Sequence, residues 1–366
     1  DHIISVALDD YGNRQLLDPD ELYRYVKSRI VDDGDHYILL DEIQLVKDFE
    51  SVVNGFLHIP NADVYVTGSN SKFLSSDVVT EFRGRGDEIR IFPLNFSEFY
   101  SAYGGNFNDA WLMFCNYGGM PLCLSMQTQA DKAKYLTNLF EATYLADIIN
   151  RNKLRGNVEI NELTDILASS IGSLTNPLKL SNTFASTKSV KLSANTISAY
   201  LGYLQDAFLI EKALRYDIKG KKYINTPAKY YFVDMGLRNA RLAFRQQEYT
   251  HIMENVIYNE LRSRGYSVDV GIVETVSKES DAWVRKPLEV DFVVNLGNRR
   301  YYIQSAYDIP SEEKMQQEQA SLLSINDAFR KIVIVNRPIL SGYNEQGILM
   351  LSLSDFLLDP EKAIDL

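Results

Sequence analysis

Cysteine and histidine are both scarce in this 366-residue sequence, which holds two cysteines and four histidines. The cysteines, Cys115 and Cys123, are too few for a disulfide framework and lack metal-ligand spacing, so we expect buried thiols and a reducing, cytoplasmic location. The histidines are scattered, at His2, His36, His58 and His251. They show neither metal-ligand spacing nor a nucleophile partner, and we expect no histidine-based chemistry.

Long apolar runs are missing as well. No run approaches the roughly 20 residues of a membrane-spanning helix, and no signal-peptide pattern opens the sequence. We therefore expect no membrane partner. The formal net charge of −11 argues against nucleic acid covering the whole surface, although a local basic region could still bind it. With 45% hydrophobic and 24% charged residues, the composition is that of a globular protein with room for two or three domains.

Residues 1–105 alternate apolar runs with helical patterns. This predicts an α/β domain with a parallel sheet covered on both faces. Asp18 is expected to cap a helix that begins at Pro19. The other expected elements are strands Ile3–Leu8, His36–Leu40, Asp63–Thr67 and Glu88–Phe92 and helices near Val46–Leu57 and Ser71–Val79. Because a buried strand starts almost at once and the first residue is Asp1 rather than Met, we expect the true N-terminus to lie upstream.

The rest of the chain changes character three times. Residues 106–170 carry helical apolar stripes and predict a helical lid. Residues 171–240 follow the order helix, helix, β-ribbon, which is the outline of a winged helix. Residues 241–366 begin with the helical pattern Met253–Arg264 and continue with short strands, which predicts a second α/β domain.

The segment His36–Glu42 is an apolar strand that ends in two acids, the Walker B arrangement. The first carboxylate of such a pair can hold the Mg²⁺ shell of a nucleotide, and the second can polarise the water that attacks the γ-phosphate. We assign the first role to Asp41 and the second, catalytic role to Glu42. The alternative is a solvated strand end.

Two further segments fit a nucleotide site. Thr67, Ser69 and Asn70 follow the next strand and can contact the γ-phosphate or the attacking water, although a turn with a helix cap is the alternative. Arg83 and Arg85 follow in a loop, where either could act as an arginine finger. A surface or ion-pairing role is the alternative for both arginines.

These motifs form part of an ordered series. Its members are Leu39-Leu40-Asp41-Glu42-Ile43-Gln44, Thr67-Gly68-Ser69-Asn70, Arg83-Gly84-Arg85, Pro93-Leu94-Asn95-Phe96-Ser97-Glu98-Phe99 and Tyr117-Gly118-Gly119-Met120-Pro121. The series closely resembles a large family of prokaryotic AAA-like P-loop ATPases, in which an ATPase domain is joined to a winged helix and a C-terminal domain of unknown function. The resemblance covers essentially the whole chain. It implies ATP and Mg²⁺ as cofactors.

In that family a Gly-rich Walker A loop precedes the strand matched here by Ile3–Leu8. This sequence has no Gly-Lys-Ser/Thr, and Gly220-Lys221-Lys222 lacks both the hydroxyl residue and the upstream glycine. Without the backbone cradle and its lysine, the chain is expected to bind ATP poorly and not to turn it over. An upstream piece absent from this sequence is our explanation, and a degenerate site is the alternative.

The winged-helix region is locally basic. Nine Lys/Arg against three acids lie between Lys179 and Lys229. A helix bearing Ser193 and Thr196 could enter a major groove of double-stranded DNA while Lys219, Lys221 and Lys222 reach phosphates. Packing or protein contact is the alternative for this module.

The resemblance continues through Lys229-Tyr-Tyr-Phe-Val-Asp234-Met-Gly236-Leu237 to a restriction-endonuclease-like C-terminal fold. Such folds use a helix Glu, a strand Asp and a Glu-x-Lys motif to hold a divalent metal, and Glu254 and Asp291 match the first two. The third position is occupied by Gln304-Ser305-Ala306. Because this change removes a ligand and the catalytic lysine together, we expect an inactive domain, with a metal nuclease as a less favoured reading.

The sequence thus predicts a Mg²⁺-dependent ATP-binding protein, an ATPase acting as a nucleotide-controlled switch when its Walker A segment is present. The alternative is a non-catalytic DNA- or protein-binding module with a structural nucleotide domain. A homo-oligomer or a protein partner is compatible with either function.

Overall fold

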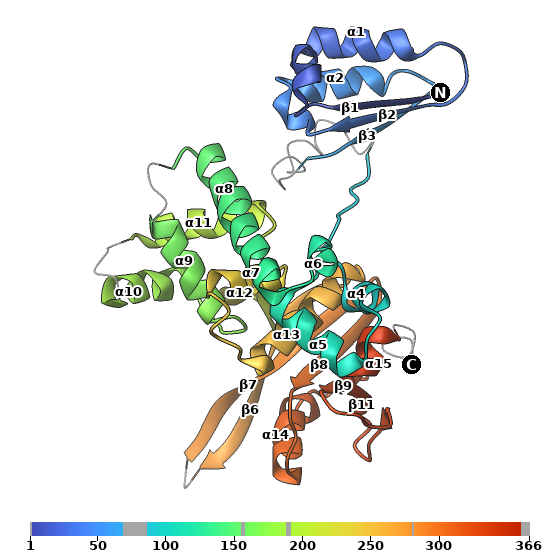
Figure 1. Cartoon of the computed structure of the whole chain (residues 1–366). Coiled ribbons are helices and arrows are strands. Elements are labelled where there is room, and N and C mark those ends of the chain that lie inside the picture. Colours follow the sequence, from blue (N-terminus) through green and yellow to red (C-terminus); the bar gives the residue numbers. More distant parts are fainter. Residues whose placement is uncertain (1, 69–85, 155–157, 188–191, 280–281, 360–366) are drawn as a thin grey trace. The chain divides into compact units, whose positions relative to one another are not determined.

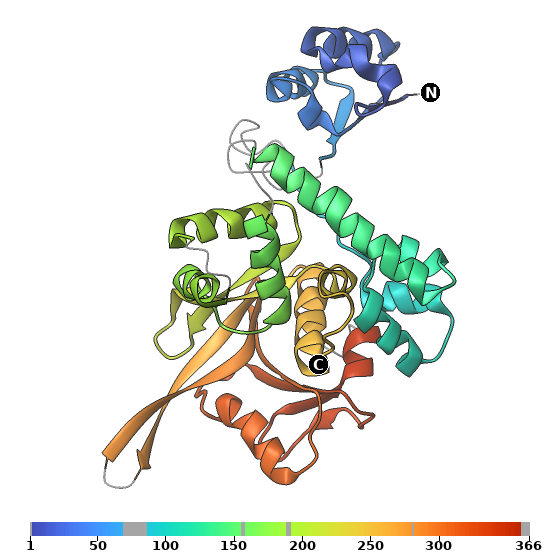
Figure 2. The same cartoon turned by 60° about the vertical axis from the view of Figure 1, so that its left-hand side comes forward.

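The structure, a computed structural model, describes residues 2–68, 86–154, 158–187, 192–279 and 282–359. The chain divides into two compact units (Figures 1 and 2). Asp1–Ile91 with Asp206–Phe208 forms the first, and Phe92–Gln205 with Leu209–Leu366 forms the second. The expected helix Ser71–Val79 lies outside the described residues.

The first unit is built on a three-stranded parallel sheet in the order β1-β2-β3. Its strands are β1 (Ile3–Ala7), β2 (His36–Asp41) and β3 (Ala62–Val66), close to the expected ranges. The register sets Ile4 beside Ile38 and Ile38 beside Val64. Since side chains alternate along a strand, these apolar residues share one face of the sheet.

Helical segments connect the strands of this unit. They are η1 (Tyr11–Leu17), α1 (Pro19–Arg29), η2 (Ile43–Leu45) and α2 (Phe49–Phe56). The expected start of α1 is confirmed, because Asp18 accepts hydrogen bonds from the backbone N–H groups of Asp20 (3.0 Å) and Glu21 (3.1 Å), with Pro19 at the first helical position. The helix expected over Val46–Leu57 is shorter than predicted, because Asp48 adopts a left-handed conformation just before α2.

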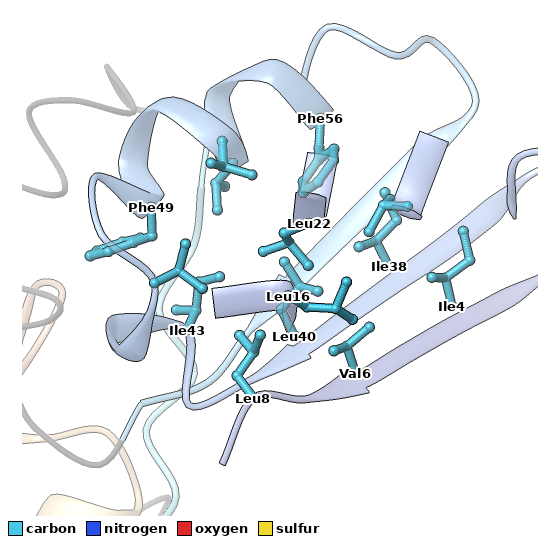
Figure 3. Packing of buried hydrophobic residues seen from close by; sticks show 14 residues of the cluster. Ile4, Val6, Leu8, Leu16, Leu22, Ile38, Leu40, Ile43, Phe49 and Phe56 are labelled. Atoms are coloured by element: carbon cyan, nitrogen blue, oxygen red, sulfur yellow. The ribbon is translucent and has the colours of Figure 1, made fainter. Parts of the chain in front are cut away.

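The core of the first unit lies between one face of the sheet and these helices (Figure 3). Leu40 and Ile38 of the sheet meet Leu22 of α1 and Phe56 of α2 there, and each of these four is fully buried. Among the described residues of this unit, no helix covers the other face (Figure 1). Large apolar side chains are exposed there, at Ile3, Tyr37, Leu39 and Tyr65. Helices therefore cover one face of the sheet, as predicted, whereas the described residues leave the other face uncovered.

The predicted strand Glu88–Phe92 is wrong. Residues 86–92 have no regular secondary structure, and Ile89 and Ile91 are 76% and 85% exposed. The alternating apolar pattern suits a strand, but a strand also needs a neighbour for its backbone N–H and C=O groups. In the described part of the chain this segment pairs with no strand and instead links the two compact units.

The second unit contains an eight-stranded mixed sheet in the order β10-β11-β9-β8-β7-β6-β4-β5. Its strands are β4 (Ile210–Asp217), β5 (Lys222–Phe232), β6 (Ser267–Glu279), β7 (Ala282–Leu296), β8 (Arg299–Ala306), β9 (Arg330–Val335), β10 (Gly342–Tyr343) and β11 (Leu349–Ser352). β4 and β5 form the ribbon predicted as part of a winged helix, and they also make one edge of this sheet, since β4 pairs in parallel with β6. β6 and β7 project from the sheet as a long ribbon (Figure 1).

The second unit also contains helices. They are α4 (Phe96–Tyr103), α5 (Phe107–Tyr117), α6 (Leu122–Ser125), α7 (Gln129–Asn138), α8 (Ala146–Arg151), α9 (Val158–Ser169), α10 (Pro177–Thr187), α11 (Ala194–Asp206), α12 (Met235–Arg241), α13 (Tyr249–Ser263), α14 (Glu312–Leu323) and α15 (Leu353–Leu358). The π-helical segment η4 (Leu139–Leu145) joins α7 and α8 into one continuous rod (Figure 2). Tyr258 of α13 packs near Phe292 of β7, whereas Leu322 of α14 belongs to the cluster around Val293. The two helices therefore cover opposite faces of the sheet.

Three of the sequence motifs meet in the second unit, and the contacts between them are structural. Gly119 N–H donates to Asp234 Oδ2 at 2.6 Å, and Gly119 O accepts from Leu94 N–H at 2.9 Å. Asp234 Oδ1 also caps α12 by accepting from Leu237 N–H at 2.9 Å. A Cβ on Gly236 would lie 2.2 Å from the backbone oxygen of Tyr117. The glycines are thus needed for close backbone approach.

The replacement Gly236→Ala is expected to destabilise the protein by about 1–3 kcal/mol, because the new methyl group meets backbone that cannot rotate away. Urea unfolding measures the change. Gly202→Ala in α11 is the matched control, since nothing lies within 4 Å of its Cβ and alanine favours helix by about 1 kcal/mol. Equal effects of the two substitutions would contradict the close approach.

Candidate functional site

Asp41 and Thr67 lie together at the carboxyl edge of the three-stranded sheet. Asp41 ends β2, and Thr67 directly follows β3. Thr67 Oγ1 donates a hydrogen bond to Asp41 Oδ1 and accepts one from Glu42 N–H at 3.3 Å. Both Asp41 and Thr67 are exposed. The structure therefore brings three of the predicted nucleotide-site residues to one point.

Glu42 has an unusual backbone conformation. Its φ of 53° lies in the left-handed region, which is unfavourable for a residue with a Cβ and is enriched at functional sites. The conformation turns the chain from β2 into η2, and Gln44 Nε2 donates to Glu42 Oε2. The turn between β2 and η2 thus orients the Glu42 carboxylate, the proposed general base, through its hydrogen bond with Gln44.

The remaining nucleotide-site predictions fall elsewhere in the chain. Ser69, Asn70, Arg83 and Arg85 lie outside the described residues. The predicted site does not include Asp9 and Asp10. They come shortly after the end of β1, whereas Asp41 is the last residue of β2 and Glu42 follows it. Asp10 accepts from Gly12 N–H at 2.9 Å and caps η1, while Asp9 is exposed. The signal that could have found them is the same one, an apolar strand ending in two acids.

The chemistry of this edge fits a magnesium nucleotide. Mg²⁺ prefers oxygen ligands and usually keeps several waters, so one or two protein carboxylates are enough. Asp41 offers an exposed carboxylate, Thr67 offers a hydroxyl group, and Glu42, the next residue in the chain, carries a second carboxylate. A Gly-Lys-Ser/Thr phosphate loop is not found in the sequence.

A second group of charged residues, buried except for the partly exposed Glu289, lies in the second unit at the predicted degenerate nuclease site. Lys229 Nζ lies 2.8 Å from Glu254 Oε1 and 2.7 Å from Glu289 Oε1. Tyr231 Oη also donates to Glu254 Oε1, at 2.6 Å. The Lys229 ammonium thus contacts carboxylate oxygens that a divalent cation would need.

Asp291 joins this cluster through a β-bulge. Asp269 pairs with Val293 and Gly271 with Val290, so two β7 residues stand opposite one β6 residue. Such bulges redirect a side chain. Asp291 Oδ2 accepts from Ser305 N–H at 2.8 Å, and Gln304 Oε1 accepts from Asp291 N–H at 3.4 Å.

The structure therefore brings Glu254, Asp291 and Gln304 together, as the motif comparison implied. It adds Lys229 and Glu289, which sequence analysis did not place there. Lys229 was counted among the basic residues of the winged helix, but its side chain is 3% exposed and faces the carboxylates. We call Lys229, Glu254, Glu289 and Asp291 the charge cluster.

Three carboxylates share one ammonium in the charge cluster, and the pKa values reflect this imbalance. Burial acts to lower the pKa of Lys229, but the charges of Glu254, Asp291 and Glu289 outweigh it and hold that pKa above its ordinary value. Burial, followed by the charge of Glu254, raises the pKa of Asp291 to about 8. Asp291 therefore keeps its proton near neutral pH.

This shift predicts how Asp291→Asn changes stability with pH. Because the folded-state pKa of about 8 lies above the ordinary value, protonated Asp291 contributes stability at acid pH that is lost as the pH rises through 8. The neutral amide has no such loss, so the variant is expected to gain stability relative to wild type between about pH 4 and pH 8. Denaturant unfolding at pH 5, 7 and 9 measures the difference in the free energy of unfolding between the variant and wild type. The exposed Asp308→Asn is the control, and a difference that stays constant over these pH values would contradict protonation of Asp291.

The lysines proposed to contact DNA lie on the hairpin between β4 and β5. Lys219, Lys221 and Lys222 are exposed. Lys219 Nζ donates to the backbone oxygen of Glu274 at 2.6 Å, and Lys222 pairs with Asp217 in the strand register. These exposed positions are compatible with DNA contact, which stays a prediction.

Comparison with known proteins places these features in a class. Residues 1–100 match the family described as AAA domain, and residues 108–248 match a domain of unknown function, DUF8612. The parallel sheet with its acidic carboxyl edge is compatible with the first match. AAA domains define a class of nucleotide-binding, ATPase-like proteins, which in general bind nucleotide together with Mg²⁺.

The chain belongs to the same family as an uncharacterized protein of Haemophilus influenzae. The two are 32% identical over 98% of this chain and 86% of the relative. An uncharacterized protein of Methanocaldococcus jannaschii is 29% identical over 92% of this chain and 75% of its own length. A crystal structure of a Vibrio cholerae protein aligns with 93% of this chain and 77% of its own at 13% identity and a TM-score of 0.22. Among the described residues, no helix is long and apolar enough to cross a membrane.

Proposed function

We propose that this chain acts as a Mg²⁺-dependent ATPase and a nucleotide-controlled switch when a Walker A segment is present. The observation that carries the proposal is the hydrogen-bonded contact between Asp41, Thr67 and the Glu42 backbone at the carboxyl edge of the sheet. The AAA-domain match over residues 1–100 supports the same function independently.

Each residue of this edge has a defined role in the proposal. Asp41 would hold the hydration shell of a bound Mg²⁺, which would neutralise charge on the ATP phosphates. Glu42 accepts a proton from the attacking water, and Thr67 orients Asp41 through their hydrogen bond. Ser69 and Asn70 contact the γ-phosphate or the attacking water together with Thr67, and Arg83 and Arg85 contact the phosphates, in cis or from another subunit.

The domain organisation is part of the same proposal. An ATPase core occupies residues 1–105, a helical lid 106–170, a winged helix 171–240 and an inactive restriction-endonuclease-like domain 241–366. The Lys229 ammonium supports inactivity, because it occupies the oxygens of Glu254 and Glu289. Nucleotide binding would bias the position of the winged helix.

Asp41→Asn tests the nucleotide site. The full-length gene product is titrated with ATP in the presence and absence of Mg²⁺, and the variant is expected to lose at least about tenfold in Mg²⁺-dependent affinity, because a neutral amide is a poorer Mg²⁺ ligand. Asp63→Asn is the matched control, since Asp63 lies exposed in β3, away from the carboxyl edge. Unchanged Mg²⁺-dependent binding in Asp41→Asn would contradict the assignment.

Absence of nucleotide binding in wild type would favour the alternative, a non-catalytic DNA- or protein-binding module. The exposed lysines of the β4–β5 hairpin, Lys219, Lys221 and Lys222, favour DNA within that alternative. Burial of Lys229 weighs against it, since one of the nine basic residues counted in this region cannot reach a phosphate.

A further inference from the structure

The first unit contains a second cluster of metal-ligating side chains, at the opposite end of the sheet from Asp41. His2 precedes β1, His36 opens β2, and Asp32 lies in the loop before β2. His36 and Asp41 are the two ends of β2, which puts about 16 Å of strand between them. The scattered positions of these histidines in the sequence gave no metal-ligand spacing, and the fold brings two of them together with a carboxylate.

We propose that His2, Asp32 and His36 bind a zinc ion. One ligand atom from each residue lies within 4.8 Å of the others. His2 Nε2 is 3.1 Å from Asp32 Oδ2, and His36 Nε2 is 4.0 Å from Asp32 Oδ1. With bonds of about 2.0–2.2 Å, the ligands of a tetrahedral zinc ion lie roughly 3.3–3.6 Å apart. Zinc binding would turn the stacked rings of His2 and His36 until their nitrogen lone pairs converge on the ion.

The hydrogen bonds around His36 prepare it as a ligand. His36 is fully buried, and its Nδ1 lies 2.7 Å from the backbone oxygen of Gly34. A carbonyl only accepts, so Nδ1 carries the proton and Nε2 has the free lone pair, 4.0 Å from Asp32 Oδ1. Val31 N–H approaches Nε2 at a long 3.4 Å. A carbonyl that fixes the tautomer of a histidine in this way is typical of zinc sites.

The surrounding loop holds the other two ligands near His36. Asn61 Nδ2 donates to Asp32 O at 3.0 Å and to Gly34 O at 2.8 Å, which anchors the loop to the sheet. The rings of His2 and His36 stack with centroids 4.4 Å apart. A Cβ on Gly34 would lie 2.6 Å from His2 Cε1, so a glycine at this position leaves room for that ring.

The ligand set favours zinc over magnesium or calcium. Two imidazoles and one carboxylate suit zinc and related transition metals, whereas Mg²⁺ and Ca²⁺ prefer sites made of oxygen. Three protein ligands leave a fourth position for water, and the side chains of His2 and Asp32 are 40% and 53% exposed, so solvent can reach it. This site is independent of the proposed ATPase function, because its ligands lie at the other edge of the sheet.

Zinc titration of the tag-free, full-length protein after chelator treatment tests the proposal. One equivalent of Zn²⁺ is expected to bind and to raise the thermal unfolding midpoint. The metal-free protein is expected to bind Co²⁺ with a visible absorption band that is lost when Zn²⁺ displaces the cobalt. His2→Ala and Asp32→Asn each alter a partly exposed side chain and are expected to weaken zinc binding at least about tenfold. His58→Ala, an exposed histidine elsewhere in the same unit, is the matched control.

Zinc binding that is absent, or that is equally strong in His2→Ala, Asp32→Asn and His58→Ala, overturns the proposal. The circular dichroism spectrum of each variant without zinc is compared with wild type, so that lost binding is scored only in folded protein. ATP binding by the same samples distinguishes this site from the nucleotide site, since it is expected to persist in His2→Ala.

Discussion

Glu42→Gln is expected to leave ATP binding intact and to lower ATP turnover by about 10²–10⁴-fold, the usual contribution of a positioned general base. Glutamine has nearly the same size and keeps the turn, but its amide cannot take a proton from water. Turnover and binding are measured on the full-length gene product. The exposed edge residue Asp41 and its partner Thr67 are unchanged in this variant, so Mg²⁺-dependent affinity is retained.

Glu42→Gly separates the backbone effect from the chemistry. Glycine relieves the left-handed conformation at φ 53° and is expected to stabilise the first unit by about 1 kcal/mol, while turnover is lost as in Glu42→Gln. A Glu42→Gln enzyme with wild-type turnover would show that another group activates the water. The strained glutamate would then have only a structural role.

Lys229→Met is expected to destabilise the protein by about 3–5 kcal/mol, because it leaves buried carboxylates without their cation. Methionine fills similar volume, so the loss comes mainly from charge. Glu254 is 7% exposed and cannot recover hydration in the folded state. Denaturant unfolding at pH 7 measures the change.

Lys222→Met, on the same strand but exposed, is the matched control and is expected to change stability by less than about 0.5 kcal/mol. A double variant, Lys229→Met with Glu254→Gln, is expected to recover part of the loss, because one unpaired charge is removed with its partner. Equal stability of Lys229→Met and Lys222→Met would contradict a charged cluster. The side chains of the charge cluster would then have to be neutral in the folded protein.

The nucleotide edge could be predicted from the sequence because its signals are local. The strand that ends at Asp41 and the helix cap at Asp18 each depend on a few adjacent residues, and both elements lie where they were expected. Thr67 could be placed beside Asp41 because neighbouring parallel strands end at one edge. The roles of these residues stay predictions.

The charge cluster and the zinc site could not be predicted in the same way. Lys229 and Glu289 are 60 positions apart, and charge counting alone assigned Lys229 to a basic surface. Asp291 is redirected by a bulge whose register depends on pairing between β6 and β7. His2 and His36 meet only because β1 and β2 are neighbours in the sheet. The strand prediction for Glu88–Phe92 is wrong for the converse reason. Its local sequence pattern suits a strand, but the segment pairs with none of the described strands.

The continuity of the eight-stranded sheet has an evolutionary consequence. β4 and β5 lie inside the matched region 108–248, whereas β6 and the strands beyond it follow that region. An isolated two-stranded hairpin is marginally stable, and a bare β6 edge would invite aggregation. Recombination that separated the coding regions of β4–β5 and of β6 onward would therefore yield two aggregation-prone fragments. The pieces have to be inherited together, even though sequence families divide them.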